Sequence, residues 1–468
     1  MSNKEKETLP KELIKIALVL VLGAIAPMLD STMVNIALND FSKDFHTSLD
    51  TIQWVITGYV LATGIAVPFS GWLINRFDGK NIYFISQLLF LISSILSGIS
   101  WNIESLIAFR LIQGFSAGLI IPLLTTLLIQ NAGQGNMGKL MSIVGVPIIL
   151  GPILGPVIGG FLVEYLSWRW IFFVNIPIGI IALYLIHKKL PNFAAANKQV
   201  KLDWFGILLL GTLSASFIYG ITKAASSSNF NNLKTIEFMA IGILLTIIYV
   251  IYAMKYSKKV IMPLNLFRHK NFTASICALF LAGIGTNGPM LLLPLFFQNI
   301  RKDTIILAGL SLIPQGLGML LVRPLIGKMI DTIGAKIVVI FSIVITFIGT
   351  MPFLYFSQST SYWIIGIVLF IRGIGIGGIT IPIMTDSYTG LSRSQIPQAS
   401  IATRIIQNVG GAFGSAILAT VVANKMQHVV PSLSNLTSAY QAGFFIALIS
   451  TTIMFIPALF LTNKLRQA

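Results

Sequence analysis

The feature that most constrains this chain is a series of long apolar runs. A helix needs roughly 20 apolar residues to cross the hydrocarbon of a bilayer, and fourteen runs are of about that length. They lie at about 13–36, 52–73, 82–100, 104–129, 139–163, 170–187, 204–221, 236–254, 272–297, 304–327, 337–356, 361–384, 398–424 and 440–462. The segments between them are short. The pattern predicts an all-α polytopic membrane protein with fourteen transmembrane helices and no inserted soluble domain.

The composition excludes other classes of protein. Of the 468 residues 55% are apolar and only 10% are charged, whereas soluble domains carry about 25% charged residues. The single cysteine, Cys277, cannot form an intramolecular disulfide, and no two of the four histidines have metal-ligand spacing. No phosphate-binding loop occurs either. We therefore expect no metal, no cofactor and no ATP-driven chemistry, and we expect the chain not to be an enzyme.

The positive charges predict the orientation of the chain. The formal net charge is +17, and cytoplasmic loops of membrane proteins collect Lys and Arg. With a cytoplasmic N-terminus, 21 Lys and Arg fall in cytoplasmic segments, 7 in outer segments and 4 within the spans. This bias predicts that both termini are cytoplasmic. It also explains the basic charge without nucleic acid as a partner.

Two sequence matches in the same order predict an internal duplication. The first pairs Pro68, Gly71 and Lys80, after span 2, with Pro324, Gly327 and Lys336, after span 10; Asn75 aligns with Asp331. The second pairs Gly118, Pro122 and Thr125 of span 4 with Gly378, Pro382 and Thr385 of span 12. Parallel repeats of this kind place a central site between two halves that rock against each other in secondary transporters.

Three local motifs stand out in the first half. The loop after span 2 has Gly71, Leu73, Arg76 and Lys80, and span 4 has Arg110, Gln113 and Gly114. Span 5 is rich in glycine and proline, with Gly145, Gly151, Pro152, Gly155, Pro156, Gly159 and Gly160. Three of its glycines recur every four residues and so share one helix face, which permits close helix contact. Its prolines remove backbone donors and favour a bend.

These motifs resemble those of the major facilitator superfamily, in particular its fourteen-span drug:proton antiporter branch. The loop departs from the family pattern, with Asn75 for Asp, Asp78 for Gly and Gly79 for Arg. The stretch Trp168–Gly179 before and into span 6 and Gly410, Gly411 and Gly414 of span 13 also resemble the family. The resemblance covers roughly residues 13–462.

The resemblance implies a fold and a set of roles. It implies a six-helix bundle over residues 1–187, two extra helices over 188–260 and a second six-helix bundle over 261–468. It also implies a cytoplasmic gating loop with Gly71, Arg76, Asp78, Lys80, Gly327 and Asp331, and a span 5 motif that acts as a hinge or seal against uncoupled leak. A monomer in a bacterial cell membrane is expected, since richness in Ile, Lys and Asn suggests an AT-rich bacterial genome.

Charged residues inside the spans point to function, because a central charge costs roughly 2.5–3.5 kcal/mol on insertion scales. Asp30 is the one carboxylate well inside an apolar run, which makes it the candidate proton carrier and acceptor for a cationic substrate. Arg110 is its expected electrostatic counterpart, with Gln113 beside it. Glu104, Glu164 and Asp386 are interpreted as interfacial charges near span ends. Arg323, Arg372 and Arg404 are interpreted as side chains that snorkel to the cytoplasmic surface.

The resulting prediction is a proton-coupled secondary transporter that exports hydrophobic or cationic small molecules by alternating access. An exporter of a lipid, an amino acid or an anionic antibiotic is the first alternative, because one fold serves many substrates. A membrane enzyme and a non-transporting membrane sensor are the others. Flux in vesicles separates a transporter from a sensor.

Overall fold

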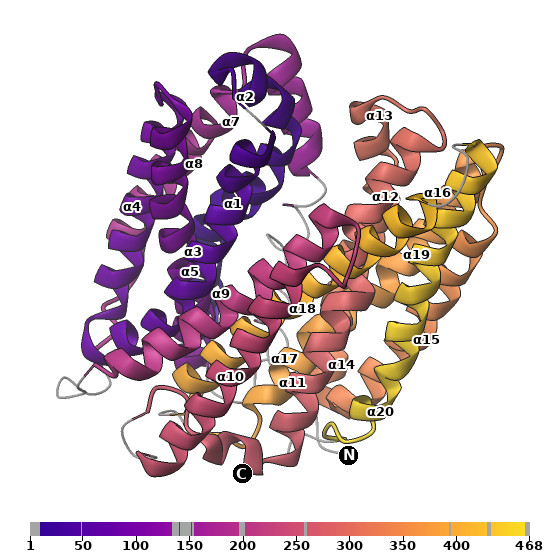
Figure 1. Ribbon diagram of the computed structural model, residues 1–468. Coiled ribbons are helices and arrows are strands. Elements are labelled where there is room, and N and C mark those ends of the chain that lie inside the picture. Colours follow the sequence, from indigo (N-terminus) through magenta and orange to yellow (C-terminus); the bar gives the residue numbers. More distant parts are fainter. Residues whose placement is uncertain are drawn as a thin grey trace.

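The computed structural model describes residues 10–47, 49–132, 140, 151, 154–195, 202–256, 260–392, 395–427 and 432–463. Helices dominate these residues, and no strand occurs among them. Figure 1 shows the earlier helices on one side of the molecule and the later ones on the other, with a middle pair in front of both groups. The predicted all-α polytopic fold is confirmed for these ranges.

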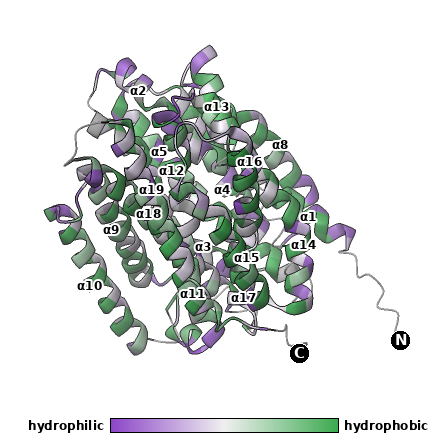
Figure 2. Ribbon diagram, turned by 90° about the vertical axis from the view of Figure 1, so that its right-hand side faces the viewer, coloured by the Kyte–Doolittle hydropathy of each residue, from purple (hydrophilic) through white to green (hydrophobic). Residues whose placement is uncertain are grey.

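The first group of helices ends at Lys189. It comprises α1 (Lys11–Met33), α2 (Leu38–Phe45), α3 (Leu49–Arg76), α4 (Gly79–Gly98), α5 (Ile103–Ala132), a helix at Leu154–Tyr165, α7 (Trp170–Phe173) and α8 (Asn175–Lys189). The middle pair is α9 (Trp204–Ser227) and α10 (Leu233–Lys255). Figure 2 shows that hydrophobic residues cover much of the helices and that hydrophilic ones gather towards the two ends of the molecule.

The last group starts after residue 260. It comprises α11 (Lys270–Ala282), a π-helical turn (Gly283–Asn287), α12 (Gly288–Asn299), α13 (Ile305–Leu310), α14 (Ile313–Ile333), α15 (Ala335–Thr350), α16 (Tyr362–Gly377), α17 (Thr380–Tyr388), α18 (Ile396–Gln427), α19 (Leu433–Ile453) and α20 (Phe455–Ala458). The domain boundaries at residues 187 and 260 stay a prediction.

Thirteen stretches within the described ranges are long and apolar enough to cross a membrane. They match thirteen of the fourteen predicted spans. The remaining one, span 5, is predicted at 139–163, where most residues before 154 lie outside the described ranges. Its described part is the shorter apolar helix Leu154–Tyr165. The count of fourteen therefore stays a prediction.

Glycine contacts show that the two groups of helices repeat one packing arrangement. Gly114 of α5 lies on the backbone of Tyr59 in α3, and Gly373 of α16 lies on the backbone of Gln315 in α14. Tyr59 and Gln315 are equivalent, because each lies nine residues before its matched proline, Pro68 or Pro324.

The match predicted within spans 4 and 12 is shifted by one residue. Gly118 contacts Thr63, and the residue of the second half equivalent to Thr63 is Met319. Met319 is contacted by Gly377, not by Gly378, which the sequence match paired with Gly118. The reason is local. α5 is continuous, whereas α16 ends at Gly377 and α17 begins at Thr380, and this break takes up the extra residue.

Pro27 shapes α1 just before Asp30. A proline inside a helix removes the donor that would bind the carbonyl four residues earlier, here that of Gly23. Gln87 of α4 replaces the missing donor, since its Nε2 donates to the Gly23 carbonyl oxygen at 2.6 Å. Tyr83 of the same helix donates to the Leu20 carbonyl at 2.6 Å. α4 therefore supplies hydrogen bonds to the part of α1 that precedes Asp30.

We predict that Gln87→Leu destabilises the protein by about 1–3 kcal/mol, because a buried carbonyl loses its donor while the side-chain volume is kept. The apparent melting temperature in detergent measures the loss. Ser86→Ala is the control, since the Ser86 hydroxyl donates only to the Ile82 carbonyl of its own helix. Its removal leaves no buried carbonyl without a donor. Equal melting temperatures for Gln87→Leu and wild type would contradict the role given to Gln87.

Candidate functional site

A buried ion pair joins α1 to α5. Asp30 is 0% exposed and Arg110 is 1% exposed, and the Nη1 atom of Arg110 donates to Oδ2 of Asp30 at 2.5 Å. Long apolar segments place both residues well inside the membrane-crossing part of their helices. Charges removed from water in this way need both a partner and further hydrogen bonds. The structure thus brings together the two charges that the sequence proposed as counterparts.

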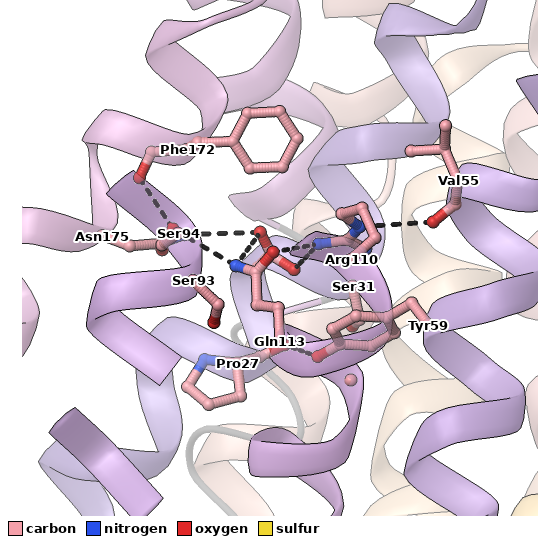
Figure 3. A network of polar contacts seen from close by, with 12 residues as sticks. Pro27, Ser31, Val55, Tyr59, Ser93, Ser94, Arg110, Gln113, Phe172 and Asn175 are labelled. Atoms are coloured by element: carbon pink, nitrogen blue, oxygen red, sulfur yellow. Dashed lines mark hydrogen bonds and ion pairs between the residues drawn. The ribbon is translucent and has the colours of Figure 1, made fainter. Parts of the chain in front are cut away.

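Amide side chains complete the hydrogen bonding of the carboxylate (Figure 3). Gln113 Nε2 donates to Asp30 Oδ1 at 3.1 Å, and Asn175 Nδ2 of α8 donates to the same oxygen at 3.3 Å. Both amides also donate to Ser94 Oγ of α4, at 3.2 and 3.0 Å. Three helices therefore meet at the carboxylate, α1, α5 and α8, and α4 is joined to them through the two amides.

Sequence reasoning did not place Asn175 and Ser94 in this site. Asn175 lies in the family-like stretch at the start of span 6, but its residue type and position do not indicate which side chain it would bind. Ser94 is one of several serines in an apolar helix, and nothing in the sequence distinguishes it. A neutral polar residue becomes a site residue only through the helix opposite it, which the sequence does not reveal.

Tyr59 separates the ion pair from a cavity. The Arg110 Cζ atom lies 4.1 Å from the centroid of the Tyr59 ring, and Arg110 Nε donates to the Val55 carbonyl at 3.2 Å. The hydroxyl of Tyr59 donates to the Pro27 carbonyl at 3.4 Å. Figure 3 shows the ring beside the guanidinium. Tyr59 therefore contacts the ion pair and also lines the cavity, whereas Asp30 and Arg110 are not among the lining residues.

The cavity lies between the two groups of helices and has a volume of about 500 Å³, within the range of small-molecule sites. Its walls come from α1, α3, α5, α9, α12 and α18, and most of the lining side chains are apolar. Pro27, Ser31 and Tyr59 belong both to this wall and to the surroundings of the ion pair. A molecule in the cavity would therefore lie one side chain away from Asp30.

The glycine stripe of span 5 packs against α1 on both sides of Asp30. Gly151 lies on Met28, Gly155 on Thr32 and Leu29, and Gly159 on Met33. The hydroxyl of Thr32 donates to the Gly151 carbonyl at 2.9 Å. Pro156 and Gly160 belong to the described helix, whereas Gly145 and Pro152 lie outside the described residues. The stripe therefore lets span 5 approach the backbone of α1 beside the ion pair.

The residues of the expected gating loop lie near the ends of α3 and α14 and the starts of α4 and α15. Gly71 contacts Ile401 of α18, across the two groups of helices. Asp78 caps α4 by accepting from the Asn81 backbone N–H at 3.1 Å. Lys80 and Arg76 are half-buried beside it, and Gly327 and Asp331 lie in the last turns of α14. Their gating role stays a prediction.

The interpretation of Asp386 as an interfacial charge is wrong. Asp386 is 1% exposed in α17, and its carboxylate accepts from the backbone N–H of Thr462 at 3.3 Å and from the Thr462 hydroxyl. Ser275 of α11 donates to it at 3.5 Å. Tertiary contact with the chain after α20 buries a residue that its position near a span end suggested would be exposed. Glu104 and Glu164 are exposed as expected.

The interpretation of Arg372 as a snorkelling side chain is also wrong. Arg372 is 1% exposed, and it donates to Gln315 Oε1 at 2.6 Å and to Thr350 Oγ1 at 3.2 Å. Arg323 is 6% exposed in α14. Arg404 faces the cavity instead of a membrane surface. Arg372 and Arg404 point into the helix bundle, because neighbouring helices supply polar partners to Arg372 and a cavity to Arg404.

Comparison with known proteins identifies relatives over most of the chain. The family profile described as Major Facilitator Superfamily matches residues 20–415. The multidrug resistance protein B homolog of Mycobacterium tuberculosis (strain ATCC 25618 / H37Rv) is 31% identical over 89% of this chain and 77% of its own length. The multidrug export protein EmrB of Haemophilus influenzae is 29% identical over 89% of this chain and 82% of its own.

Two solved structures share the fold. The proton:xylose symporter XylE aligns with a TM-score of 0.66 at 16% identity, over 96% of this chain and 97% of its own. The human organic anion transporter MFSD10 aligns with a TM-score of 0.64 at 14% identity, over 94% of this chain and 100% of its own. At such identities the likeness concerns the fold alone.

We predict that Gly155→Ala impairs transport, because its new methyl group would displace the Thr32 hydroxyl from the Gly151 carbonyl. Overpacking of this kind costs about 1–3 kcal/mol. Gly64→Ala is the matched control, since its nearest neighbour, Ile218 Cδ1, would be 3.6 Å from the added carbon. Efflux rates and melting temperatures of the two variants provide the test. Wild-type efflux by Gly155→Ala would show that the contact between span 5 and α1 tolerates an added methyl group.

Proposed function

We propose that this chain, which belongs to the major facilitator superfamily, exports small amphipathic molecules from a bacterial cell in exchange for protons. The observation that carries the proposal is the buried Asp30–Arg110 pair one side chain away from a cavity between the halves. The names of the bacterial relatives support drug export. The family and the relatives indicate a transporter rather than an enzyme.

In this proposal Asp30 carries the proton. When Asp30 is ionised, it holds Arg110, Gln113 and Asn175 together. When it is protonated, the charge attraction to Arg110 is lost, and the contacts of Arg110 with the Val55 carbonyl, the Gln113 oxygen and the rings of Tyr59 and Phe172 remain. Arginine itself does not give up its proton usefully. Protonation would therefore loosen α1 from α5 without removing the positive charge.

The geometry suggests how this change reaches the cavity. Asp30 lies between Pro27 and Ser31, which line the cavity, and next to Thr32, which binds the glycine stripe of span 5. A shift of α1 would move all three contacts together. Tyr59 would have to leave its place between the ion pair and the cavity for a proton to pass between them. This linkage supports alternating access with proton exchange at one side at a time.

We further propose fourteen spans, both termini in the cytoplasm and gating by the Gly71 loop. The linker after α8 and the chain after α20 bind at corresponding helix starts, since Gly79 N–H of α4 donates to the Phe193 carbonyl and Lys336 N–H of α15 to the Thr462 carbonyl, each at 3.0 Å. Both contacts lie at helix ends that carry clusters of basic residues, which are typical of a cytoplasmic face. The contact of Gly71 with Ile401 closes the two halves at that end.

We predict that Asp30→Asn abolishes proton-driven accumulation in inverted vesicles. Asparagine keeps the shape and can accept from Arg110, but it cannot ionise. The single variant leaves the Arg110 charge buried without its partner, which is destabilising, so the double variant Asp30→Asn/Arg110→Gln is made beside it. Removal of both charges should restore the melting temperature but not the accumulation.

Asp40→Asn, at a half-buried position in the first turn of α2, is the control for the substitution itself and should transport normally. Accumulation by the folded double variant at the wild-type rate would exclude Asp30 as the proton carrier. A folded wild-type protein that moves no substrate at all would favour the sensor instead.

The proposed orientation predicts which loops react from outside the cell. In a Cys277→Ser background, a membrane-impermeant maleimide should label a cysteine at Asn231, between α9 and α10, and spare one at Asn192, after α8. Both positions are exposed. Lysed cells should show both labelled, which controls for reactivity. Labelling of position 192 in intact cells would reject the proposed topology.

A further inference from the structure

The charge lining the cavity points to a class of substrate that the sequence did not favour. Arg404 of α18 is the only charged side chain among the described residues that line the cavity, and no carboxylate lines it. We infer that the cavity binds amphipathic molecules that carry an anionic group, and that Arg404 is the residue that binds this group. The inference rests on the proposed export function and specifies its substrate.

One face of α18 forms the wall that carries Arg404. The lining residues of this helix recur at three- and four-residue intervals, as expected for a single helical face: Arg404, Gln407, Asn408, Gly411, Ala412, Ser415, Ala416 and Ala419. Arg404 lies nearest the start of the helix. Gln407 and Asn408 adjoin it at this end of the face, and small residues follow, all of them apolar except Ser415. Such a gradient suits a molecule with one polar end.

Close backbone contacts on a neighbouring face of α18 hold the lining face toward the cavity. Gly410 lies on the backbone of Phe280 in α11, and Gly414 lies on the backbone of Gly283 in the π-helical turn. Backbone contacts as close as these leave the helix little freedom to rotate. The place of Arg404 in the cavity wall is therefore constrained by the packing of α18 against α11 and the π-helical turn.

Arg404 has no carboxylate partner among the described residues. Its Nη1 donates to Gln407 Oε1 of its own helix at 3.3 Å, and none of the ion pairs found in those ranges includes it. A guanidinium presents five donors in a planar fork that matches carboxylate, sulfonate and phosphate groups. An uncompensated charge beside apolar walls is costly, and a bound anion would compensate it.

Asp30 does not offset this positive charge in the cavity. Asp30 is fully buried, its carboxylate is engaged by Arg110, Gln113 and Asn175, and Tyr59 stands between the pair and the cavity. A cationic molecule would thus meet Arg404 with no carboxylate to bind. This arrangement argues against the cationic substrates that the position of Asp30 in the sequence had suggested.

The inserted helix α9 supplies an apolar wall for the other end of such a molecule. Ile218, Thr222 and Ala225 of α9 line the cavity, and the rings of Phe217 and Phe413 meet behind them at 6.4 Å between centroids. Ile56, Val60 and Ile121 from the first half line the cavity as well. The cavity therefore offers a cationic group at one place and hydrocarbon surface elsewhere.

Binding of matched fluorescent probes tests the inference. The full-length protein in lipid nanodiscs is titrated with 1-anilinonaphthalene-8-sulfonate, an anion, and with N-phenyl-1-naphthylamine, which has the same ring system without the sulfonate; empty nanodiscs give the background. Arg404→Gln should weaken binding of the anion about tenfold or more, as expected for the loss of a charged hydrogen bond. Binding of the neutral probe should change less than about twofold, which also reports that the cavity is intact.

Two further variants sharpen the test. Arg404→Lys keeps the charge and should retain part of the anion affinity. Lys425→Gln removes a cation from the exposed far end of the same helix and should leave both probes unaffected. An equal loss for both probes in Arg404→Gln, or tighter binding of tetraphenylphosphonium than of the sulfonate by the wild type, would overturn the inference.

The outcome is separable from that of the proposed function, because binding is measured without a proton gradient. Arg404-dependent anion binding by a protein that shows no proton-driven export would count against the coupling. Normal export together with charge-independent binding would count against the anionic substrate.

Discussion

Hydrocarbon offers no hydrogen-bond partner, so every polar group that this protein places within the membrane must find one inside the protein. The structure depends on how this constraint is met. Asp30 accepts hydrogen bonds from three donors on two helices. Gln87 donates to the Gly23 carbonyl, which lacks its helix donor because of Pro27, and Arg372 donates to Gln315 and Thr350. Each of these contacts ties one helix to another. The polar groups that cost most to insert are therefore the ones that fix how the helices are arranged.

The same constraint explains which parts of the site the sequence could predict. A charge in an apolar run is conspicuous, so Asp30 and Arg110 could be singled out and paired. The glycine stripe could be assigned to one helix face, because the spacing of residues on a helix is fixed. The helix that this face contacts could not be named, and neither could Asn175 or Ser94, whose roles arise only from the helices opposite them.

Position along a run was a poor guide to burial. Asp386 lies near the end of its span and yet is buried, because the chain after α20 folds back onto it. Arg372 and Arg404 seemed free to reach a membrane surface, but one binds the neighbouring helices and the other faces the cavity. The fold itself was more predictable than these details, since thirteen of the expected spans follow from the length and apolarity of their sequence alone.

The place of α9 has a consequence for how molecules could enter. α9 packs against both α3 and α18, with Gly211 on Ile65 and Phe217 beside Phe413, so it covers the seam between the two halves on its side. The other seam runs where Val157 meets Gly309, and no added helix packs there among the described residues. The two sides of the transporter are thus unequal toward the lipid. A molecule dissolved in the bilayer would therefore meet one seam covered by α9 and one seam without an added helix.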